Sequence, residues 1–187
     1  MDPVRAAANT ARRALGLLTI EQNAALIERG VFVLDPYSTF IGPDVRFGAN
    51  VTLWPNTTLT GHVTIGDHAE IGAEGGFTLQ ADNAHIHIGA HTRLLGGGAL
   101  TLENHIGDGA QILGPIRAQH CTLGAGGSWR DPDPDRRGGV LKGNGVARNL
   151  IVPQGHVIQA FGLFADATMR RQSYFHPVRL SASEDNR

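Results

Sequence analysis

The sequence predicts a mainly β fold in which short parallel strands wind into a three-sided solenoid, a parallel β-helix. The strongest signal is a six-residue unit that repeats seven times in succession between Ile41 and Asp82. The first place of each unit is large and apolar, and the fifth is small or β-branched. A helix repeats about every 3.6 residues and a strand about every two, so neither explains this period. Three units, each one strand and one corner, close a triangular coil that stacks on the next.

Length, charge and cysteine content narrow the class of protein. The chain has 187 residues, a formal net charge of -1 and a single cysteine, Cys121. This charge creates no field that would attract nucleic acid, and no apolar run is long enough to cross a membrane, so we expect neither as a partner. One cysteine excludes an internal disulfide and suits a reducing compartment. We therefore expect a cytoplasmic protein.

Residues 1–30 predict a helical segment. One helix is expected from Pro3 to Gly16, with proline in the first turn and glycine as its stop. Thr19 and Gln22 have the spacing of a capping box, which predicts a second helix as far as Arg29. The first helix has one apolar stripe, made by Val4, Ala7, Ala8, Ala11 and Leu15. We expect both helices to cover the first coil, whose strand groups would otherwise stay unpaired.

The β-helix is predicted over residues 31–163, with about five coils. Its six-residue frame slips by one residue after Asp82 and again near residues 118–123. A solenoid tolerates such slips because each coil contacts only its neighbours. The repeats resume at Val140 and continue to the end of the predicted β-helix.

Residues 126–139 break the pattern. They lack an apolar period, contain two prolines and have glycines at each end. They predict a loop thrown out from a corner, which we call the excursion. Residues 164–187 are expected to leave the coil as a tail, with a short arm first and a polar, disordered stretch from Leu180 onward.

The start of the β-helix resembles a known family over about fifty residues. The shared pattern is GV…DP…T…I…V followed by PNT.L.G.T.IG, between Leu26 and Ala73. It is similar to the junction in the bifunctional N-acetylglucosamine-1-phosphate uridylyltransferase/glucosamine-1-phosphate N-acetyltransferase. In that family a nucleotidyltransferase domain leads through a helix into a left-handed β-helical acetyltransferase domain. The resemblance implies a left-handed coil without the nucleotidyltransferase domain, for which a separate nucleotidyltransferase would be the partner.

The resemblance also implies an activity. It predicts a hexapeptide-repeat N-acetyltransferase that acts on an amino sugar phosphate or a nucleotide sugar, uses acetyl-CoA as donor, and belongs to UDP-N-acetylglucosamine biosynthesis. Such proteins are homotrimers with sites between subunits, so we expect a homotrimer. The KAGH run that carries the family's catalytic histidine has no match in this sequence. The alternative is therefore a non-catalytic trimeric binding or scaffold β-helix that has lost the active site.

The excursion carries the best candidates for substrate binding. Loops of this kind often line a site, and its aromatic and guanidinium groups suit a ring and phosphate oxygens. The excursion candidates are Trp129, Arg130, Arg136 and Arg137. Arg93 stands where the resembled family has an RLRPGA stretch whose arginines face sugar phosphate. The alternative is a solvated loop whose aspartates and arginines pair locally.

His120 is the candidate general base. Acetyl transfer to an amine needs a group that takes the amine proton, and imidazole suits neutral pH. A surface histidine at a corner is the alternative, with His105 as the next candidate base. The coenzyme is expected near the late coils, because related acyltransferases bind it between subunits there. The candidates for that site are Ala147, Arg148, Arg170 and Arg171.

Nine histidines raise the question of a metal site. Zinc-dependent β-helical carbonic anhydrases use three histidines, two of them with four residues between. Here His85, His87 and His91 have different spacings, and by the six-residue count His62, one coil earlier, falls on a different face from His91. Metal ligands must converge within a few ångströms. We expect no metal, and a gamma-type carbonic anhydrase-like protein is the least favoured alternative.

Overall fold

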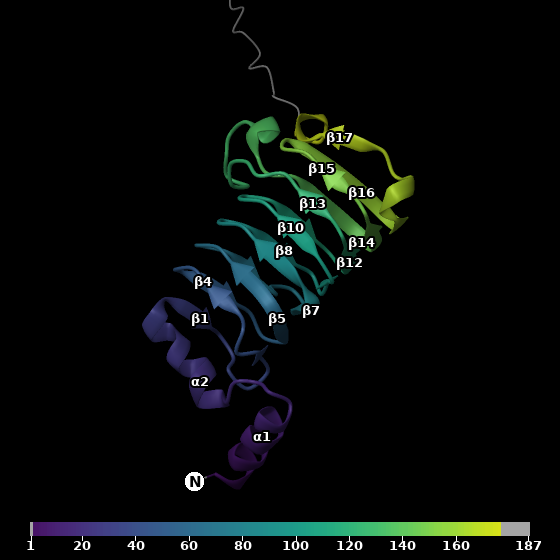
Figure 1. The fold of residues 1–187 in the computed structure, drawn as a ribbon. Coiled ribbons are helices and arrows are strands. Elements are labelled where there is room, and N and C mark those ends of the chain that lie inside the picture. The colour runs from purple at the N-terminus through teal and green to yellow at the C-terminus, as the bar shows by residue number, and fades with distance from the viewer. Residues whose placement is uncertain (1, 177–187) are drawn as a thin grey trace, which may run out of the picture.

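The computed structural model describes residues 2–176, and its strands form the predicted left-handed parallel β-helix (Figure 1). Each coil adds one strand to each of three faces. The first face contains β1 (Val31–Val33), β4 (Val51–Leu53), β6 (Glu70–Ile71), β8 (Arg93–Leu95), β11 (Gln111–Leu113) and the first halves of β14 (Val140–Arg148) and β16 (His156–Leu163). The second face contains β2 (Phe40–Ile41), the first halves of β5 (Thr57–Ile65) and β7 (Phe77–Ile88), β9 (Ala99–Thr101), β12 (Ile116–Gln119) and the second halves of β14 and β16. The third face contains β3 (Arg46–Phe47), the second halves of β5 and β7, β10 (Asn104–Ile106), β13 (Thr122–Leu123) and β15 (Ile151–Val152).

The prediction of about five coils was wrong. On the first face, seven strands stack within the described residues. The extra strands β1 and β13 lie where the six-residue frame is absent or broken. A strand there needs only a neighbouring coil to pair with, so an imperfect unit still forms one.

Inward side chains of the three faces meet in a continuous apolar core. Leu59, Ile86, Leu100 and Ile112 are fully buried within it. The frame slip after Asp82 is absorbed at a corner, where the pairing of β5 with β7 is irregular between Thr60 and His62. The core therefore stays in register above and below the slip.

One corner of the prism repeats an unusual backbone conformation. Between the third and first faces, Asn50, His68, His91 and Gly109 all have positive φ, at 56°, 57°, 55° and 67°. Residues with a Cβ rarely adopt this region. A Cβ on Gly109 would lie 2.3 Å from the carbonyl oxygen of Gly127, so only glycine fits at this corner, against the start of the excursion one coil later.

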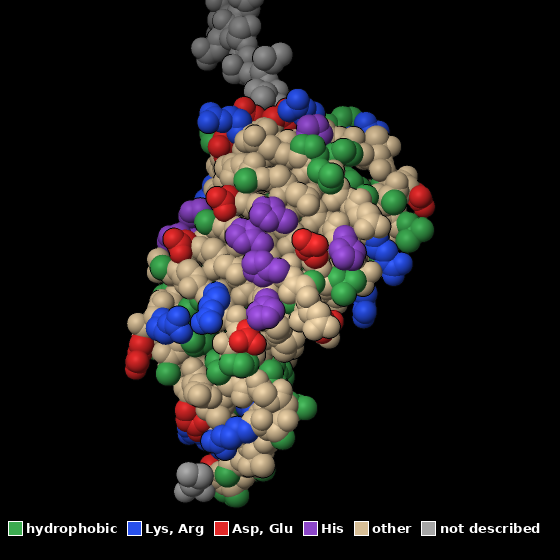
Figure 2. Space-filling view, in the orientation of Figure 1, with side chains coloured by type: hydrophobic (Ala, Val, Ile, Leu, Met, Phe, Trp, Pro, Cys, Tyr) green, Lys and Arg blue, Asp and Glu red, His purple; other side chains and the backbone are tan. Residues whose placement is uncertain are grey.

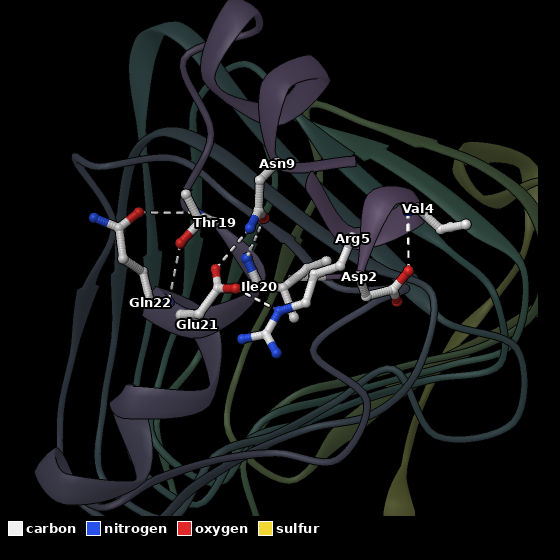
Figure 3. Close-up of polar contacts among 8 residues, drawn as sticks. All are labelled: Asp2, Val4, Arg5, Asn9, Thr19, Ile20, Glu21 and Gln22. Carbon is white, nitrogen blue, oxygen red and sulfur yellow. Dashed lines mark hydrogen bonds and ion pairs between the residues drawn. The ribbon is translucent and has the colours of Figure 1, made fainter. Parts of the chain in front are cut away.

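The N-terminal helices are α1 (Pro3–Ala14) and α2 (Ile20–Ala25), followed by the 3₁₀ helix η1 (Leu26–Arg29). The predicted capping box is present (Figure 3): the Thr19 hydroxyl accepts from the Gln22 N–H, and the Gln22 amide oxygen accepts from the Thr19 N–H. Gly30 ends the segment with a φ of 75°. Among the described residues, no helix is both long and apolar enough to cross a membrane.

The apolar stripe of α1 does not face the first coil. Val4 and Leu15 at its two ends are 73% and 75% exposed. The helix is fastened by polar side chains instead. Asn9 donates to Glu21 and accepts from the Ile20 N–H, which ties α1 to α2 (Figure 3). Arg12, buried over the Phe40 ring, donates to four backbone carbonyls, those of Leu18, Pro36, Tyr37 and Thr39.

The C-terminal end is closed by a short return of the chain. Phe164 in η3 (Phe164–Asp166) is fully buried above the last coil. Strand β17 (Met169–Arg171) then pairs antiparallel with the first half of β16, and η4 (Gln172–Tyr174) follows it. The excursion contains η2 (Pro134–Arg136). The stretch from Leu180, expected to be disordered, lies outside the described residues.

Replacing Arg12 with alanine should release α1 from the first coil. The substitution removes four hydrogen bonds to carbonyls, although Asn23 still donates to two of them, those of Pro36 and Thr39. Hydrogen bonds to a charged group are worth roughly 1.5–3 kcal/mol each. We expect amide protection in α1 to fall by about 2 kcal/mol while the strands keep theirs. Hydrogen exchange measured by mass spectrometry tests this, with Arg13→Ala, an exposed neighbour, as control. Unchanged protection of α1 in Arg12→Ala would contradict the anchoring role.

Candidate functional site

The excursion folds back over the outer surface of the first face. Its base is closed by hydrogen bonds from the Gly127 N–H to the Arg136 carbonyl at 2.7 Å and from the Gly138 N–H to the Gly127 carbonyl at 3.0 Å. Inside it, the Arg137 guanidinium donates twice to the Asp131 carbonyl, at 2.8 and 2.7 Å. The excursion is therefore a loop closed at its base and cross-linked inside by the Arg137 side chain.

Trp129 connects the excursion to the first face. Its ring lies 4.7 Å from the guanidinium carbon of Arg93 and 4.9 Å from that of Arg130. Arg93 donates to Glu70 at 3.1 Å, and the other oxygen of Glu70 accepts from the Trp54 indole at 3.1 Å. The pairing of β6 with β8 sets Glu70 directly beside Arg93. The structure thus brings together three of the predicted residues, Arg93, Trp129 and Arg130.

A cavity of about 240 Å³, the upper hollow, lies on the first face between the excursion and the C-terminal return. Three cationic side chains line it, Arg93, Arg137 and Lys142, together with the rings of Trp129 and Phe175. Among the described residues that line it, none is acidic. The remaining polar lining consists of Gln111, Gln159, Gln172 and His176. This composition suits an anionic ligand with a ring or sugar body.

The two walls of the upper hollow are joined to each other. The Asp135 carboxylate in the excursion accepts from the N–H and the hydroxyl of Ser173, each at 2.9 Å. The buried Gln172 amide donates to the Gly138 carbonyl at 2.7 Å. The Ser173 N–H, followed by its hydroxyl, holds the pKa of Asp135 below its ordinary value. We call this set of contacts the latch.

Two further hollows adjoin the upper one. The lower hollow, about 520 Å³, lies on the other side of Trp129 and is lined by His68, His91 and Glu70. The His68 and His91 rings stack there at 4.9 Å. The end hollow, about 720 Å³, lies at the C-terminal end and shares Gln159 and Phe175 with the upper hollow. Its other lining includes Phe161, Leu163, Tyr174 and Arg170.

Other predicted site residues lie apart from Trp129. His120 is exposed at the corner between β12 and β13 and lines none of the hollows described above. Arg136 is exposed on the outside of the excursion, and Arg148 is exposed on the second face. Ala147 points into the core, so only its backbone is available to a ligand. Arg170 and Arg171 project from β17, with Arg170 over the Tyr174 ring at 4.4 Å.

The sequence did not identify the other residues that line the upper hollow. Lys142, the single lysine of the chain, was not a candidate, nor were Phe175 and His176 of the tail. The register could have found part of it, because Gln111 and Val140 occupy the same column as Arg93. No sequence signal places the tail residues, since they reach the hollow only through the latch.

Histidines gather on the third face, across several neighbouring coils (Figure 2). His87 and His105 stack at 4.7 Å, and His85 shares a hydrogen bond with Thr64 at 2.9 Å. Burial, then the neighbouring histidines, lowers the pKa of His87. Within residues 2–176, no three histidine, cysteine or acidic side chains converge as metal ligands would.

No family model and no curated protein matches this sequence. Solved structures align with this chain only at low identity and low TM-score. A mutant of GDP-perosamine N-acetyltransferase from Caulobacter crescentus, in complex with CoA and GDP-perosamine, aligns at 19% identity over 87% of this chain with a TM-score of 0.34. PerB from the same organism aligns at 19% identity over 87% of this chain with a TM-score of 0.32. This chain covers only 65% and 66% of those two chains, and likeness at this level shows nothing about its activity.

The latch should weaken in acid. Because the pKa of Asp135 is lowered in the fold, its contribution is present above the ordinary value of 3.8 and disappears as the pH falls through the lower, folded value. Asp135→Asn should weaken the latch wherever the wild-type carboxylate is ionised, and there make the excursion more accessible. We expect trypsin to cut after Arg130 and Arg136 several-fold faster in this variant at pH 8. Asp166→Asn, an acidic site outside the latch, is the control, and equal cleavage of Asp135→Asn and wild type would contradict the latch.

Proposed function

We propose that this protein is a hexapeptide-repeat acyltransferase that moves an acetyl group from acetyl-CoA to the amine of a sugar phosphate or nucleotide sugar. The observation that carries the proposal is the upper hollow, with three cations and two aromatic rings beside the excursion. Guanidinium and ammonium groups bind phosphate oxygens through charge-assisted hydrogen bonds. The aromatic rings supply apolar surface for the sugar.

The acceptor is the smaller of the two ligand classes. Ligand pockets typically measure about 300–1,000 Å³, and the upper hollow has about 240 Å³. That room favours an amino sugar phosphate, such as glucosamine 1-phosphate, over a whole nucleotide sugar. Lys142 is exposed and has no hydrogen-bond or ion-pair partner among the described residues, so its ammonium group is free to meet the phosphate. This acceptor would place the reaction in UDP-N-acetylglucosamine biosynthesis, in the cytoplasm, with a separate nucleotidyltransferase acting on the product.

The donor would bind at the end hollow. Coenzyme A carries several phosphate groups, and the exposed Arg170 and Arg171 stand on the strand beside this hollow, with Arg148 on the second face. The exposed ring of Phe161 offers apolar contact. Because the end and upper hollows share Phe175, a thioester bound in one would reach an amine bound in the other.

The reaction needs one proton acceptor. The amine nitrogen attacks the thioester carbonyl carbon, a C–N bond forms, the C–S bond breaks, and the coenzyme leaves as a thiolate. The amine gives up one proton to a general base, and the thiolate takes up one. His120 would serve from a neighbouring subunit of a side-by-side homotrimer, since its exposed corner faces away from the hollow of its own chain. His176 lines the upper hollow of the same chain and is the competing base.

Replacing Lys142 with alanine should weaken acceptor binding. Losing one charge-assisted hydrogen bond costs about 1.5–3 kcal/mol, so we expect the KM for glucosamine 1-phosphate to rise roughly ten- to hundredfold. Release of free thiol from acetyl-CoA measures the rate. Arg117→Ala, a cation on the second face, should leave the KM unchanged.

Lys142 also permits a direct binding test. As the single lysine, it is the one side-chain amine that an amine-reactive reagent can label, and N-acetylglucosamine 1-phosphate should protect it. Protection without any acetyl transfer would favour the non-catalytic binding protein. If neither protection nor transfer is observed, the upper hollow is neither an acetyl-transfer site nor a binding site for this sugar phosphate.

The two candidate bases are separable by mixing subunits. A general base contributes about 10²–10⁴-fold in rate, so the variant that loses the base should lose that factor in kcat. If His120 acts in trans, co-assembled His120→Ala and Lys142→Ala subunits should recover part of the activity that each lacks alone. Full activity in His120→Ala, with a large loss in His176→Ala, would assign the base to His176.

A further inference from the structure

The N-terminal end of the molecule contains an apolar helix surface and an apolar groove, both uncovered. The α1 stripe consists of Val4, Ala7, Ala8, Ala11 and Leu15. The N-terminal groove, about 300 Å³, is lined by Ala24, Ile27, Phe32, Val33, Leu34 and Pro36. We propose that the α1 stripe of one copy of this chain docks into the N-terminal groove of a second copy.

The stripe is uncovered because α1 is fastened by a different side. At about 100° per residue, Arg12 lies about a quarter of a turn and Asn9 about two fifths of a turn around the helix from the line through Val4, Ala11 and Leu15. The four carbonyls bound by Arg12 and the contact of Asn9 with Glu21 fix that orientation. The helix of one chain is therefore held with its apolar side pointing away from its own first coil.

A short helix whose apolar side is exposed is expected to pack that side against a partner. A helix of 12 residues is marginal in water by itself, and the stability of most helices comes from packing an apolar face. Here that face buries little within one chain, since Val4 and Leu15 are 73% and 75% exposed. Apolar surface left in this way marks a contact site.

The groove has the matching character. It lies between the end of α2 and the outer side of β1, and its larger side chains are half exposed: Ile27 52%, Phe32 39% and Leu34 51%. Apolar side chains on both walls can pack against the valine, alanine and leucine side chains of the stripe. A helix lying there would remove apolar area from water on both partners.

Charge favours this pairing over other occupants. Helix α1 contains three arginines and no acidic residue between Pro3 and Ala14. Arg5 pairs with Glu21 and Arg12 is buried, which leaves the exposed Arg13 for a partner. The groove is flanked in sequence by two carboxylates, Glu28 and Asp35, against one further cation, Arg29.

The geometry of the contact makes it heterologous. The stripe of one copy meets the groove of another, so each copy offers one of each surface, and such contacts close into a ring when the rotation allows it. A ring of three would agree with the predicted homotrimer. The inference does not depend on the proposed activity.

Light scattering coupled to gel filtration tests the docking. The wild type should exceed the monomer mass of 19.9 kDa. Leu15→Lys in the stripe and Leu34→Lys in the groove should each weaken assembly at least tenfold, because both place a charge in an apolar contact. Leu163→Lys, an equally exposed leucine at the far end of the solenoid, should not. Both test sites are exposed, so thermal melts should stay unchanged; if Leu34→Lys melts early, Ile27→Lys replaces it.

Mixing the two variants gives the decisive result. Leu15→Lys subunits keep an intact groove and Leu34→Lys subunits keep an intact stripe, so the mixture should form a dimer that neither variant forms alone. A wild-type monomer, an assembly unchanged in both variants, or a mixture that stays monomeric would overturn the docking. Binding of the wild type to phosphatidylserine vesicles, abolished by Leu15→Lys but not by Leu34→Lys, would also overturn it, by making the stripe a membrane contact.

Discussion

The parallel register between neighbouring coils is the constraint on which the rest of the structure depends. Strands of adjacent coils lie about 4.8 Å apart, so residues at matching places form columns. On the first face, Glu70, Arg93, Gln111 and Val140 make one such column. A slip of one residue would exchange inward and outward side chains. The register therefore makes the ion pair between Glu70 and Arg93 and sets the height at which Trp129 packs.

The sequence predicted the features that repeat or that depend on near neighbours. Large apolar residues at every sixth place predicted the coil. Thr19 and Gln22 predicted the start of a helix, and the structure contains that capping box. The coil count was too low because strands such as β13 form where the repeat is broken, on the strength of pairing alone. Arg93 and Trp129 were both predicted and do meet, although they lie 36 residues apart in the chain.

What could not be predicted depends on contacts between distant or competing groups. The latch joins Asp135 to Ser173, 38 residues away, and neither residue has a distinctive pattern around it. Hydrophobic periodicity does not predict the orientation of α1, because it leaves out the polar contacts that compete with burial of the apolar side. Four carbonyl groups near Arg12 outweigh an apolar side made mostly of alanine, because a buried cation must keep its hydrogen bonds.

The latch makes the candidate site part of the C-terminal end of the solenoid. Gln172 donates through its backbone to the Gly155 carbonyl and through its side chain to the Gly138 carbonyl, so one residue joins the last coil to the excursion. Gln111, Val140 and Val157 face outward yet are only 5–6% exposed, because the excursion and the return cover them. The excursion adds no long strand, but it shields the outer side of three coils. A ligand in the upper hollow touches both walls, and by mass action it would stabilise the last coils more than the first.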